Sequence, residues 1–275
     1  MEPYLPNYLK GKNRRLVFDL LRERGQMSRA EITRDTGMSF PTAMKVVDAF
    51  LEKGLLVELD ETGPAAGAGR KGRLLRFEPG AYRAVGVECE GRFARVGLAD
   101  MAGGVQARET IELGDFARTR DLSPLAAAIR RMCAAANGAP VLGVCIGFPA
   151  NLDPDAAAIV SYAAMDIQQP TSFAQVFPAF WREVELPVYL ENDANLACEG
   201  EAFLRRGAGG AANMLYLSIG SGCGGAVRLD GKLRRGARCR AGEVGAMLLQ
   251  PALGAPGRSA ARETLEDAVC LAALE

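Results

Sequence analysis

The chain has 275 residues, of which 49% are hydrophobic, and its 33 basic side chains balance 33 acidic ones. It contains no histidine, which excludes histidine-based acid–base catalysis, histidine metal ligands and histidine pH switches. No apolar run approaches the roughly 20 residues that cross a bilayer, and the N-terminus lacks the hydrophobic core of a secretion signal. We therefore expect a cytoplasmic protein without membrane contact, with room for a small domain and a larger one.

Seven cysteines are scattered along the chain without a Cys-x-x-Cys pair. This spacing is typical of reduced thiols in the cytosol. We expect neither disulfides nor a cysteine zinc site.

Residues 28–54 predict two short helices separated by a tight turn. Ser28 and Glu31 have the spacing of a capping box at a helix start, and Gly37 allows the chain to reverse after that helix. Ser39 is expected to cap the second helix. One apolar stripe of this second helix should face a small core, and it consists of Phe40, Ala43, Met44, Val47, Phe50 and Leu51.

The outer face of the second helix and a following hairpin are predicted to contact DNA. The first two turns of that helix leave four residues on the outer face: Ser39, Pro41, Thr42 and Lys45. A strand over 55–59 and a Gly/Ala/Pro stretch over 63–69 lead to three basic residues, Arg70, Lys71 and Arg73. In winged helix-turn-helix domains the second helix enters the major groove, and basic side chains reach phosphates or a narrow minor groove.

We therefore predict a winged helix-turn-helix DNA-binding domain over residues 1–78, with double-stranded operator DNA as its partner. A small excess of Lys and Arg over Asp and Glu in residues 1–80 agrees with this interpretation. The alternative is a small helical domain that merely packs on the rest of the chain.

From residue 81 the pattern changes to short strands that alternate with helices. The predicted strands are 84–89, 93–98, 106–113, 141–148, 187–190, 214–219 and 226–229, and the predicted helices are 122–136, 173–183 and 194–205. This alternation indicates an α/β layered domain. The glycine loop 220–225 joins strand to strand, whereas a dinucleotide-binding loop must open a helix, so that function is excluded.

Several motifs occur in a recognisable order in this region. They are Ile146-Gly147-Phe148-Pro149, Glu191-Asn192-Asp193-Ala194-Asn195, the glycine loop over 219–225 and Ala241-Gly242-Glu243-Val244-Gly245. Together with the winged helix-turn-helix, this order resembles the ROK family of bacterial sugar kinases and sugar-responsive repressors, which includes xylose and N-acetylglucosamine repressors. The resemblance implies a two-lobed, actin-like or ribonuclease-H-like α/β fold with a sugar in the cleft, with lobe 1 over 79–190 and lobe 2 over 191–275.

The resemblance also implies ligand-binding residues. Asp193 matches the base of the kinases, Asn192 and Glu243 match positions that hold sugar hydroxyls, and Glu266 matches a further sugar ligand. A carboxylate can accept two hydroxyl hydrogen bonds at once. The alternatives are that Asp193 caps the helix that starts at Ala194 and that Glu266 is a solvated helix charge. The family's further sugar-binding Asn is absent, and Asp166 or Gln168 could substitute for it.

Three departures from the family pattern argue against kinase activity and metal binding. The kinases' phosphate loop Asp-x-Gly-Gly-Thr-Lys is replaced by residues 88–93, which place Glu88 and Glu90 where a phosphate would approach, with no compensating cation expected. Ala246 replaces a zinc-binding His, and 256–264 lacks the family's cysteines, so no metal or other cofactor is expected. The third departure is length, which predicts a shortened lobe 2 and an incomplete C-terminal lobe.

These observations predict a DNA-binding transcriptional regulator, a repressor, that responds to a sugar or other small polar effector and has no catalytic residues. Two DNA-reading heads require a homo-dimer or a higher homo-oligomer. The alternatives are a DNA-binding or dimerisation protein that senses no ligand and a sugar kinase.

Overall fold

The computed structural model describes residues 5–62, 73–205, 212–249 and 264–270. The chain divides into two compact units. Unit 1 comprises Met1–Arg83 with two short segments, Ala99–Gln106 and Gly138–Pro140, and unit 2 comprises the remainder. Within the described ranges, no helix has the length and apolar character needed to cross a membrane.

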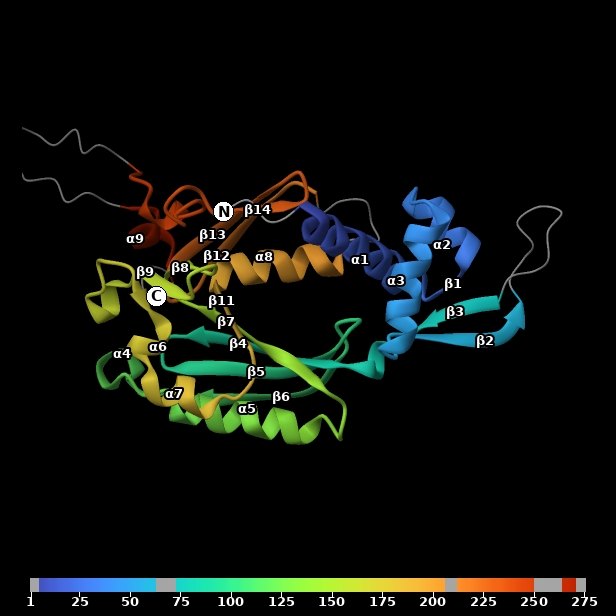
Figure 1. Ribbon diagram of the computed structural model, residues 1–275. Coiled ribbons are helices and arrows are strands. Elements are labelled where there is room, and N and C mark those ends of the chain that lie inside the picture. The colour runs from blue at the N-terminus through green and yellow to red at the C-terminus, as the bar shows by residue number, and fades with distance from the viewer. Residues whose placement is uncertain (1–4, 63–72, 206–211, 250–263, 271–275) are drawn as a thin grey trace, which may run out of the picture. The chain divides into compact units, whose positions relative to one another are not determined.

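Unit 1 combines a helical cluster with a three-stranded antiparallel sheet (Figure 1). Its helices are α1 (Leu5–Arg24), α2 (Arg29–Thr36) and α3 (Phe40–Glu52), and its strands are β1 (Gln26–Ser28), β2 (Leu56–Thr62) and β3 (Arg73–Phe77). The sheet order is β1-β3-β2. Side chains from all three helices and from the sheet form one apolar core, so these elements fold as a single packing unit.

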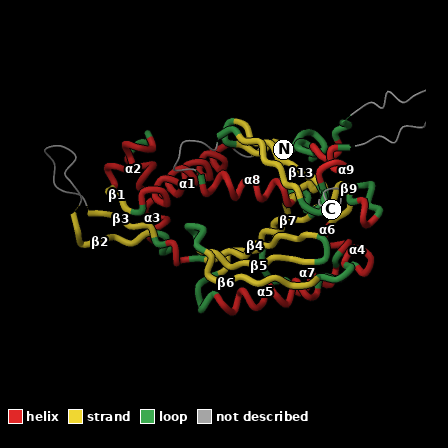
Figure 2. The backbone as a smooth tube through the Cα atoms, turned by 180° about the vertical axis from the view of Figure 1, so that it is seen from behind, coloured by secondary structure: helices red, strands yellow, loops and turns green. Residues whose placement is uncertain are grey.

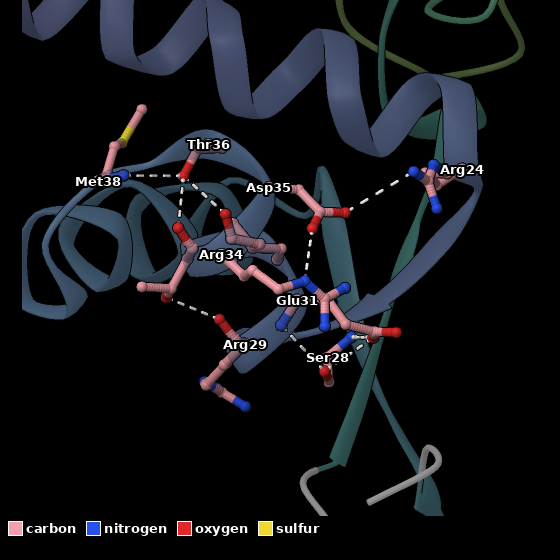
Figure 3. A network of polar contacts seen from close by, with 10 residues as sticks. Arg24, Ser28, Arg29, Glu31, Arg34, Asp35, Thr36 and Met38 are labelled. Carbon is pink, nitrogen blue, oxygen red and sulfur yellow. Dashed lines mark hydrogen bonds and ion pairs between the residues drawn. The ribbon is translucent and has the colours of Figure 1, made fainter. Parts of the chain in front are cut away.

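The predicted start and end of α2 are confirmed. The Ser28 hydroxyl accepts a hydrogen bond from the Glu31 backbone N–H, and the Glu31 carboxylate accepts one from the Ser28 backbone N–H at 2.8 Å. Figure 3 shows this capping box. Gly37 ends α2 in the left-handed region at φ 67°, and its N–H is donated to the Arg34 carbonyl. Thr36 bonds back to the Ile32 carbonyl at 2.6 Å. The turn into α3 is therefore fixed by local bonds.

One prediction for α3 is wrong, and a second is confirmed only in part. Phe40 was expected in the core, but it is 56% exposed, whereas Val46, which was not assigned to the apolar stripe, is buried. Phe40 is the first residue of the helix, and the buried part of the stripe starts at Ala43. Ser39 occupies the N-cap position, but its hydroxyl bonds to the Thr42 hydroxyl at 2.8 Å rather than to a backbone N–H.

The sequence interpretation also missed α1 and β1. Helix α1 buries Val17 and Leu21 completely, two residues with the i, i+4 spacing that marks one helix face. This signal is short, since most of the helix is polar. Strand β1 has only three residues, which is too short for alternation to be recognised.

Unit 2 contains a five-stranded sheet in the order β11-β7-β4-β5-β6. Its strands are β4 (Arg83–Glu90), β5 (Phe93–Asp100), β6 (Val105–Glu112), β7 (Val141–Phe148) and β11 (Val188–Asn192). Strands β7 and β11 are parallel. Figure 1 shows α5 (Ser123–Ala135) and α7 (Pro178–Glu183) along one face of this sheet. The five strands were all predicted, with ends that differ by one or two residues.

The core beneath this sheet is built around an aromatic cluster. Phe148 lies within 6 Å, ring centroid to ring centroid, of four other rings: Phe116, Tyr162, Phe173 and Phe177. The predicted single helix over 173–183 is two helices, α6 (Phe173–Val176) and α7. Pro178 explains the break, because it has no N–H to continue the helix and restricts the residue before it.

A second sheet of unit 2 has the order β12-β13-β14, with strands β12 (Met214–Ile219), β13 (Cys223–Leu229) and β14 (Lys232–Arg234). Helix α8 (Asp193–Leu204) contacts β7 and β11 of the first sheet as well as β12 and β13. It therefore lies between the two sheets, as Figure 2 shows from behind. Asp230 and Gly231 both have positive φ, which confirms the predicted hairpin turn.

Shorter elements complete the described part of unit 2. A small sheet was not predicted, and its strands are β8 (Asn151–Asp153), β9 (Ala158–Ser161) and β10 (Thr171–Ser172). Single helical turns follow at α4 (Phe116–Thr119), at Ala163–Met165 and at Val244–Ala246, and α9 (Leu265–Val269) is the last helix described. These segments surround the ends of the larger strands, where the site lies.

Candidate functional site

Unit 2 contains a cavity of about 920 Å³, which is within the usual size of a small-molecule site. It is lined by residues of the five-stranded sheet and of the β12-β13-β14 sheet, by the start of α8, by the β12–β13 glycine loop and by the loop that follows β14. Its wall bears six carboxylates and one guanidinium: Glu88, Glu90, Asp166, Asp193, Glu243, Glu266 and Arg240. The cavity can therefore accept many hydrogen bonds from a polyhydroxylated ligand.

All four predicted ligand residues line this one cavity, although they are far apart in the sequence: Asn192, Asp193, Glu243 and Glu266. Asp166 and Gln168, the suggested substitutes for a missing Asn, line it as well. Gln168 donates a hydrogen bond to the Asp166 carboxylate at 3.1 Å. The fold thus brings the predicted residues together, while their role in ligand binding stays a prediction.

The β11–α8 junction fixes the orientation of Asn192 and Asp193. Helix α8 starts at Asp193, so the predicted cap is displaced by one residue: the Asn192 side chain accepts the Asn195 N–H at 3.1 Å. The Asn192 amide nitrogen donates to the Ala150 carbonyl at 3.4 Å. One Asp193 oxygen accepts the Ala194 N–H at 2.9 Å. That bond uses one carboxylate oxygen, so Asp193 keeps acceptor capacity for a ligand.

Two carboxylates of the cavity are easier to protonate than usual. The pKa of Asp193 is raised, mainly because burial disfavours its charge and further because Glu88 and Glu90 are nearby. The pKa of Glu243 is also raised by desolvation and by the Asp193 charge, while Arg240 opposes the shift. Burial and neighbouring like charges thus both favour the protonated forms of these two carboxyl groups.

Glycines allow the loop that carries Glu243 to pack directly on β13. A Cβ at Gly245 would lie 2.1 Å from the Cys223 carbonyl oxygen, which no side chain could tolerate without backbone movement. A Cβ at Gly242, where φ is 97°, would lie 2.4 Å from the Gly225 carbonyl oxygen. The glycines of the Ala-Gly-Glu-Val-Gly motif thus place Glu243 against the cavity by close backbone approach.

The Glu266 side chain is hydrogen-bonded to the end of the glycine loop. Its carboxylate accepts a hydrogen bond from the Cys223 backbone N–H at 2.9 Å, and a Cβ at Gly222 would lie 2.9 Å from the same oxygen. Glu266 lies in α9, whose start is fixed by a capping box between Thr264 and Asp267. Backbone N–H groups of glycine loops commonly bind anions, and here one of them already binds a side-chain carboxylate.

The expectation that Glu88 and Glu90 lack a compensating cation is wrong. Arg95 on β5 pairs with both, donating to Glu88 at 2.8 Å and to Glu90 at 2.6 Å. Sequence spacing did not reveal this contact because Arg95 lies on the neighbouring strand. The trio still carries one net negative charge, so the pair is neutralised only in part.

Sequence reasoning missed residues that hold the cavity wall in place. Glu191 is 7% exposed, and its carboxylate pairs with Arg235, with an Nε–Oε2 distance of 2.9 Å. The same side chain accepts the Asn195 amide at 3.0 Å. This contact ties the loop after β14 to the end of β11, directly before Asn192. Glu191 belongs to a quoted motif, but its partner 44 residues away could not be inferred.

In unit 1, the predicted DNA-contacting residues of α3 lie at its N-terminal end. Ser39, Pro41 and Lys45 are exposed and Thr42 is half-buried. Arg73 starts β3 with a side chain that is 62% exposed, 3.7 Å from the Glu58 carboxylate. Arg70 and Lys71 lie outside the described residues. The DNA-binding role of these side chains stays a prediction.

The described ranges contain no cluster of three or more Cys, Asp or Glu side chains placed to hold a metal ion. Ala246, at the position of the family's zinc-binding His, is exposed. Most of the stretch over 256–264 lies outside the described residues.

The two sheets with α8 between them, and the cavity they line, define a sugar-kinase-like α/β fold. A protein-family model described as "ROK family" matches residues 84–272, and the chain belongs to the ROK family. The crystal structure of a ROK family transcriptional regulator, a homolog of E. coli MLC protein, has the same fold: TM-score 0.74, 18% identity, covering 97% of this chain and 66% of that one. The ROK hexokinase of Thermus thermophilus gives a TM-score of 0.53 at 28% identity, covering 70% of this chain and 62% of that one.

Curated relatives include both regulators and enzymes. The xylose repressor of Caldicellulosiruptor bescii is 27% identical over 86% of this chain and 58% of its own length. The glucokinase of Halalkalibacterium halodurans is 34% identical over 48% of this chain and 39% of its own length. The chain thus spans less than two thirds of the length of these proteins.

Proposed function

We propose that this protein is a DNA-binding transcriptional repressor whose ROK domain binds a sugar or another small polar effector. Residues 1–78 form the winged helix-turn-helix, 79–190 lobe 1 and 191–275 lobe 2 of the ROK domain. The protein acts on double-stranded operator DNA as a homo-dimer or a higher homo-oligomer, since paired half-sites require two reading heads.

The observation that carries this proposal is the arrangement of α2, its Gly37 turn and α3, followed by the β2–β3 hairpin. It matches a helix-turn-helix with a wing: α3 is the recognition helix, and its exposed N-terminal end carries Ser39, Pro41 and Lys45. Basic side chains such as Arg73 then contact phosphates next to the groove. The C. bescii relative, which is named a xylose repressor, aligns over 86% of this chain and supports the same function.

The cavity of unit 2 supports a small polar effector. Asn192, Asp193, Glu243 and Glu266 present acceptors that suit hydroxyl groups, as their family positions imply. A ligand in this cavity can change DNA binding only if it binds one arrangement of the dimer better than the other.

Two contacts argue against a sugar kinase, although kinases are among the relatives. Glu88 and Glu90 keep a net negative charge even with Arg95, and the Cys223 N–H of the glycine loop is occupied by Glu266. Both features oppose the approach of a triphosphate. An ATP-consumption assay with hexoses and amino sugars tests this point. If the protein consumed ATP and Asp193→Asn abolished this turnover, the protein would be a sugar kinase and the proposed repressor function would be wrong.

DNA binding is tested by selecting duplexes from a random pool with the full chain and measuring affinity by gel shift over a salt series. Arg73→Ala should weaken binding to all sequences and lower the salt slope by about one. Thr42→Ala should change the selected sequence instead. Arg118→Ala is the matched control, since Arg118 is an exposed arginine on α4 that pairs with the nearby Asp115, and it should leave both unchanged. Failure to enrich any duplex would refute the proposal.

Effector binding is tested by thermal shift with a panel of pentoses, hexoses and amino sugars. A ligand that binds only the folded state must raise the melting temperature. A panel that gives no shift, with DNA binding intact, would favour a regulator that senses no sugar.

A further inference from the structure

Phe40 is an exposed aromatic residue at the N-terminal end of α3, the helix that we assign to DNA. It is 56% exposed and lies at the first position of α3, between Ser39 and Pro41. Burial of a Phe side chain stabilises a fold, but unit 1 leaves Phe40 exposed. Phe50, on the same helix, is 7% exposed and belongs to the core. The fold of unit 1 therefore does not account for an aromatic residue at position 40.

The first turn of α3 is fixed by its own bonds. The Ser39 carbonyl accepts both the Thr42 and the Ala43 N–H at 3.0 Å, and the Ser39 and Thr42 hydroxyls bond to each other at 2.8 Å. The backbone that carries Phe40 is thus held in place before any partner binds. A side chain on a preorganised backbone loses less conformational entropy on binding.

We propose that Phe40 reads the C5-methyl group of a thymine in the major groove of the operator. This inference rests on the proposed function, because it requires that α3 is the recognition helix. The thymine methyl is the apolar group that base pairs display in the major groove, and Phe is among the side chains that contact it. Insertion of Phe40 as a wedge between base steps would be typical of minor-groove binding and would not depend on a methyl group.

The chemistry around Phe40 suits one such contact beside polar ones. Lys45 is exposed on the same helix and can donate to a guanine or a phosphate. The paired hydroxyls of Ser39 and Thr42 can bond to base edges or phosphates. The N-terminal end of α3 thus combines one apolar contact with several polar ones, and Phe40 supplies the discrimination between thymine and cytosine.

The experiment is a double-mutant cycle between protein and DNA. After duplexes have been selected from a random pool with the full 275-residue protein, each thymine of the selected site is replaced in turn by deoxyuridine. This change removes the methyl group and keeps the base pairing. Affinities are measured by fluorescence anisotropy for the unaltered protein, Phe40→Ala and Phe40→Leu. Melting curves of the variants verify the fold, which an exposed position should not disturb.

We expect one thymine per half-site at which deoxyuridine weakens binding by about fourfold, the factor that burial of one methyl-sized group gives. Phe40→Ala should lose a similar factor and no longer distinguish thymine from uracil there, while Phe40→Leu should retain part of the discrimination. Leu16→Ala, an apolar residue of α1 that is 43% exposed, is the control and should leave the discrimination intact.

Two results would overturn the inference even if the protein binds DNA. One is that replacing thymine by deoxyuridine weakens binding at no position. The other is that the Phe40→Ala variant distinguishes thymine from uracil as well as the unaltered protein does. Tight binding that Phe40→Ala weakens equally on thymine and uracil would show a wedge or packing role instead. If no duplex were selected at all, the proposed function itself would fail.

Discussion

The two strand meanders of unit 2 have the same strand arrangement, but the outer faces of their first strands differ in exposure to solvent. In β4–β5–β6 and in β12–β13–β14, residues on alternate positions of the first strand line the cavity, among them Glu88 in β4 and Tyr216 in β12. The opposite face of β4 consists of Val85, Val87 and Cys89, which are at most 2% exposed. The opposite face of β12 consists of Leu215, Leu217 and Ile219, which are 50–62% exposed.

The difference lies in the layer that covers each outer face. Helices α5 and α7 contribute to the core that buries Val87 (Figure 1). In the described part of the chain, the outer face of β13 is covered by the loop with Gly242 and Val244, and the apolar side chains of β12 stay open to solvent. Alternation in a sequence thus tells which face is apolar, but the covering layer decides whether that face is buried.

The largest expected effect is at the buried face. Val87→Asp would place an unpaired carboxylate in the core, which should cost on the order of 4 kcal/mol or more. Trp181 is the chain's only tryptophan and packs on this core, so its fluorescence reports the urea unfolding of unit 2. An unchanged midpoint would mean that the β4 face is not buried in solution.

A smaller loss is expected where the loop covers β13. Gly245→Ala would force a Cβ to within 2.1 Å of the Cys223 carbonyl oxygen unless the backbone moves, and such shifts cost about 1–3 kcal/mol. Gly200→Ala is the matched control, because a Cβ there meets nothing within 4 Å and Ala is a better helix residue than Gly. If both variants unfolded at the same urea concentration, the loop would not pack on β13 as described.

The sequence predicts the strands and the cavity residues of unit 2 better than it predicts the contacts between them. Strands of both meanders were recognised from alternation and glycine turns, and the cavity residues Asn192, Asp193, Glu243 and Glu266 from motifs that resemble the ROK family. Contacts between distant segments were not recognisable. Arg95 pairs across strands and Arg235 across 44 residues, and neither pair leaves a local pattern. Phe40 was predicted in the core because helical spacing shows which residues share one face of a helix, but not how far along that face the core extends.

A pH-dependent effect is expected at the inner faces, which share the cavity. The pKa of Asp193 is raised in the folded state, so the folded protein binds this proton more tightly than the unfolded chain. Stability is therefore lost as the pH rises from the ordinary carboxyl pKa through the raised one. Asp193→Asn removes the penalty and can still accept the Ala194 N–H.

We expect Asp193→Asn to raise the urea midpoint at neutral pH, by less than the loss at Gly245→Ala, and to give no gain below about pH 3, where the carboxyl is protonated in both states. Asp48→Asn, at an exposed position of α3, is the control and should not change the pH profile of Trp181 fluorescence. A gain of equal size at both pH values would assign the effect to packing rather than to the charge.

The smallest effect is expected at the position of β12 that corresponds to Val87. Leu217 is 50% exposed, so Leu217→Asp should change the free energy of unfolding by no more than about 0.5 kcal/mol. It should also reduce any concentration-dependent light scattering, because it interrupts an exposed apolar strip. The same Trp181 assay serves here, which makes the pair Val87→Asp and Leu217→Asp a direct comparison of the two outer faces. If Leu217→Asp lowered the midpoint as much as Val87→Asp, the β12 face would be buried in the folded protein, and the two meanders would differ in which chain segment covers them rather than in whether they are covered.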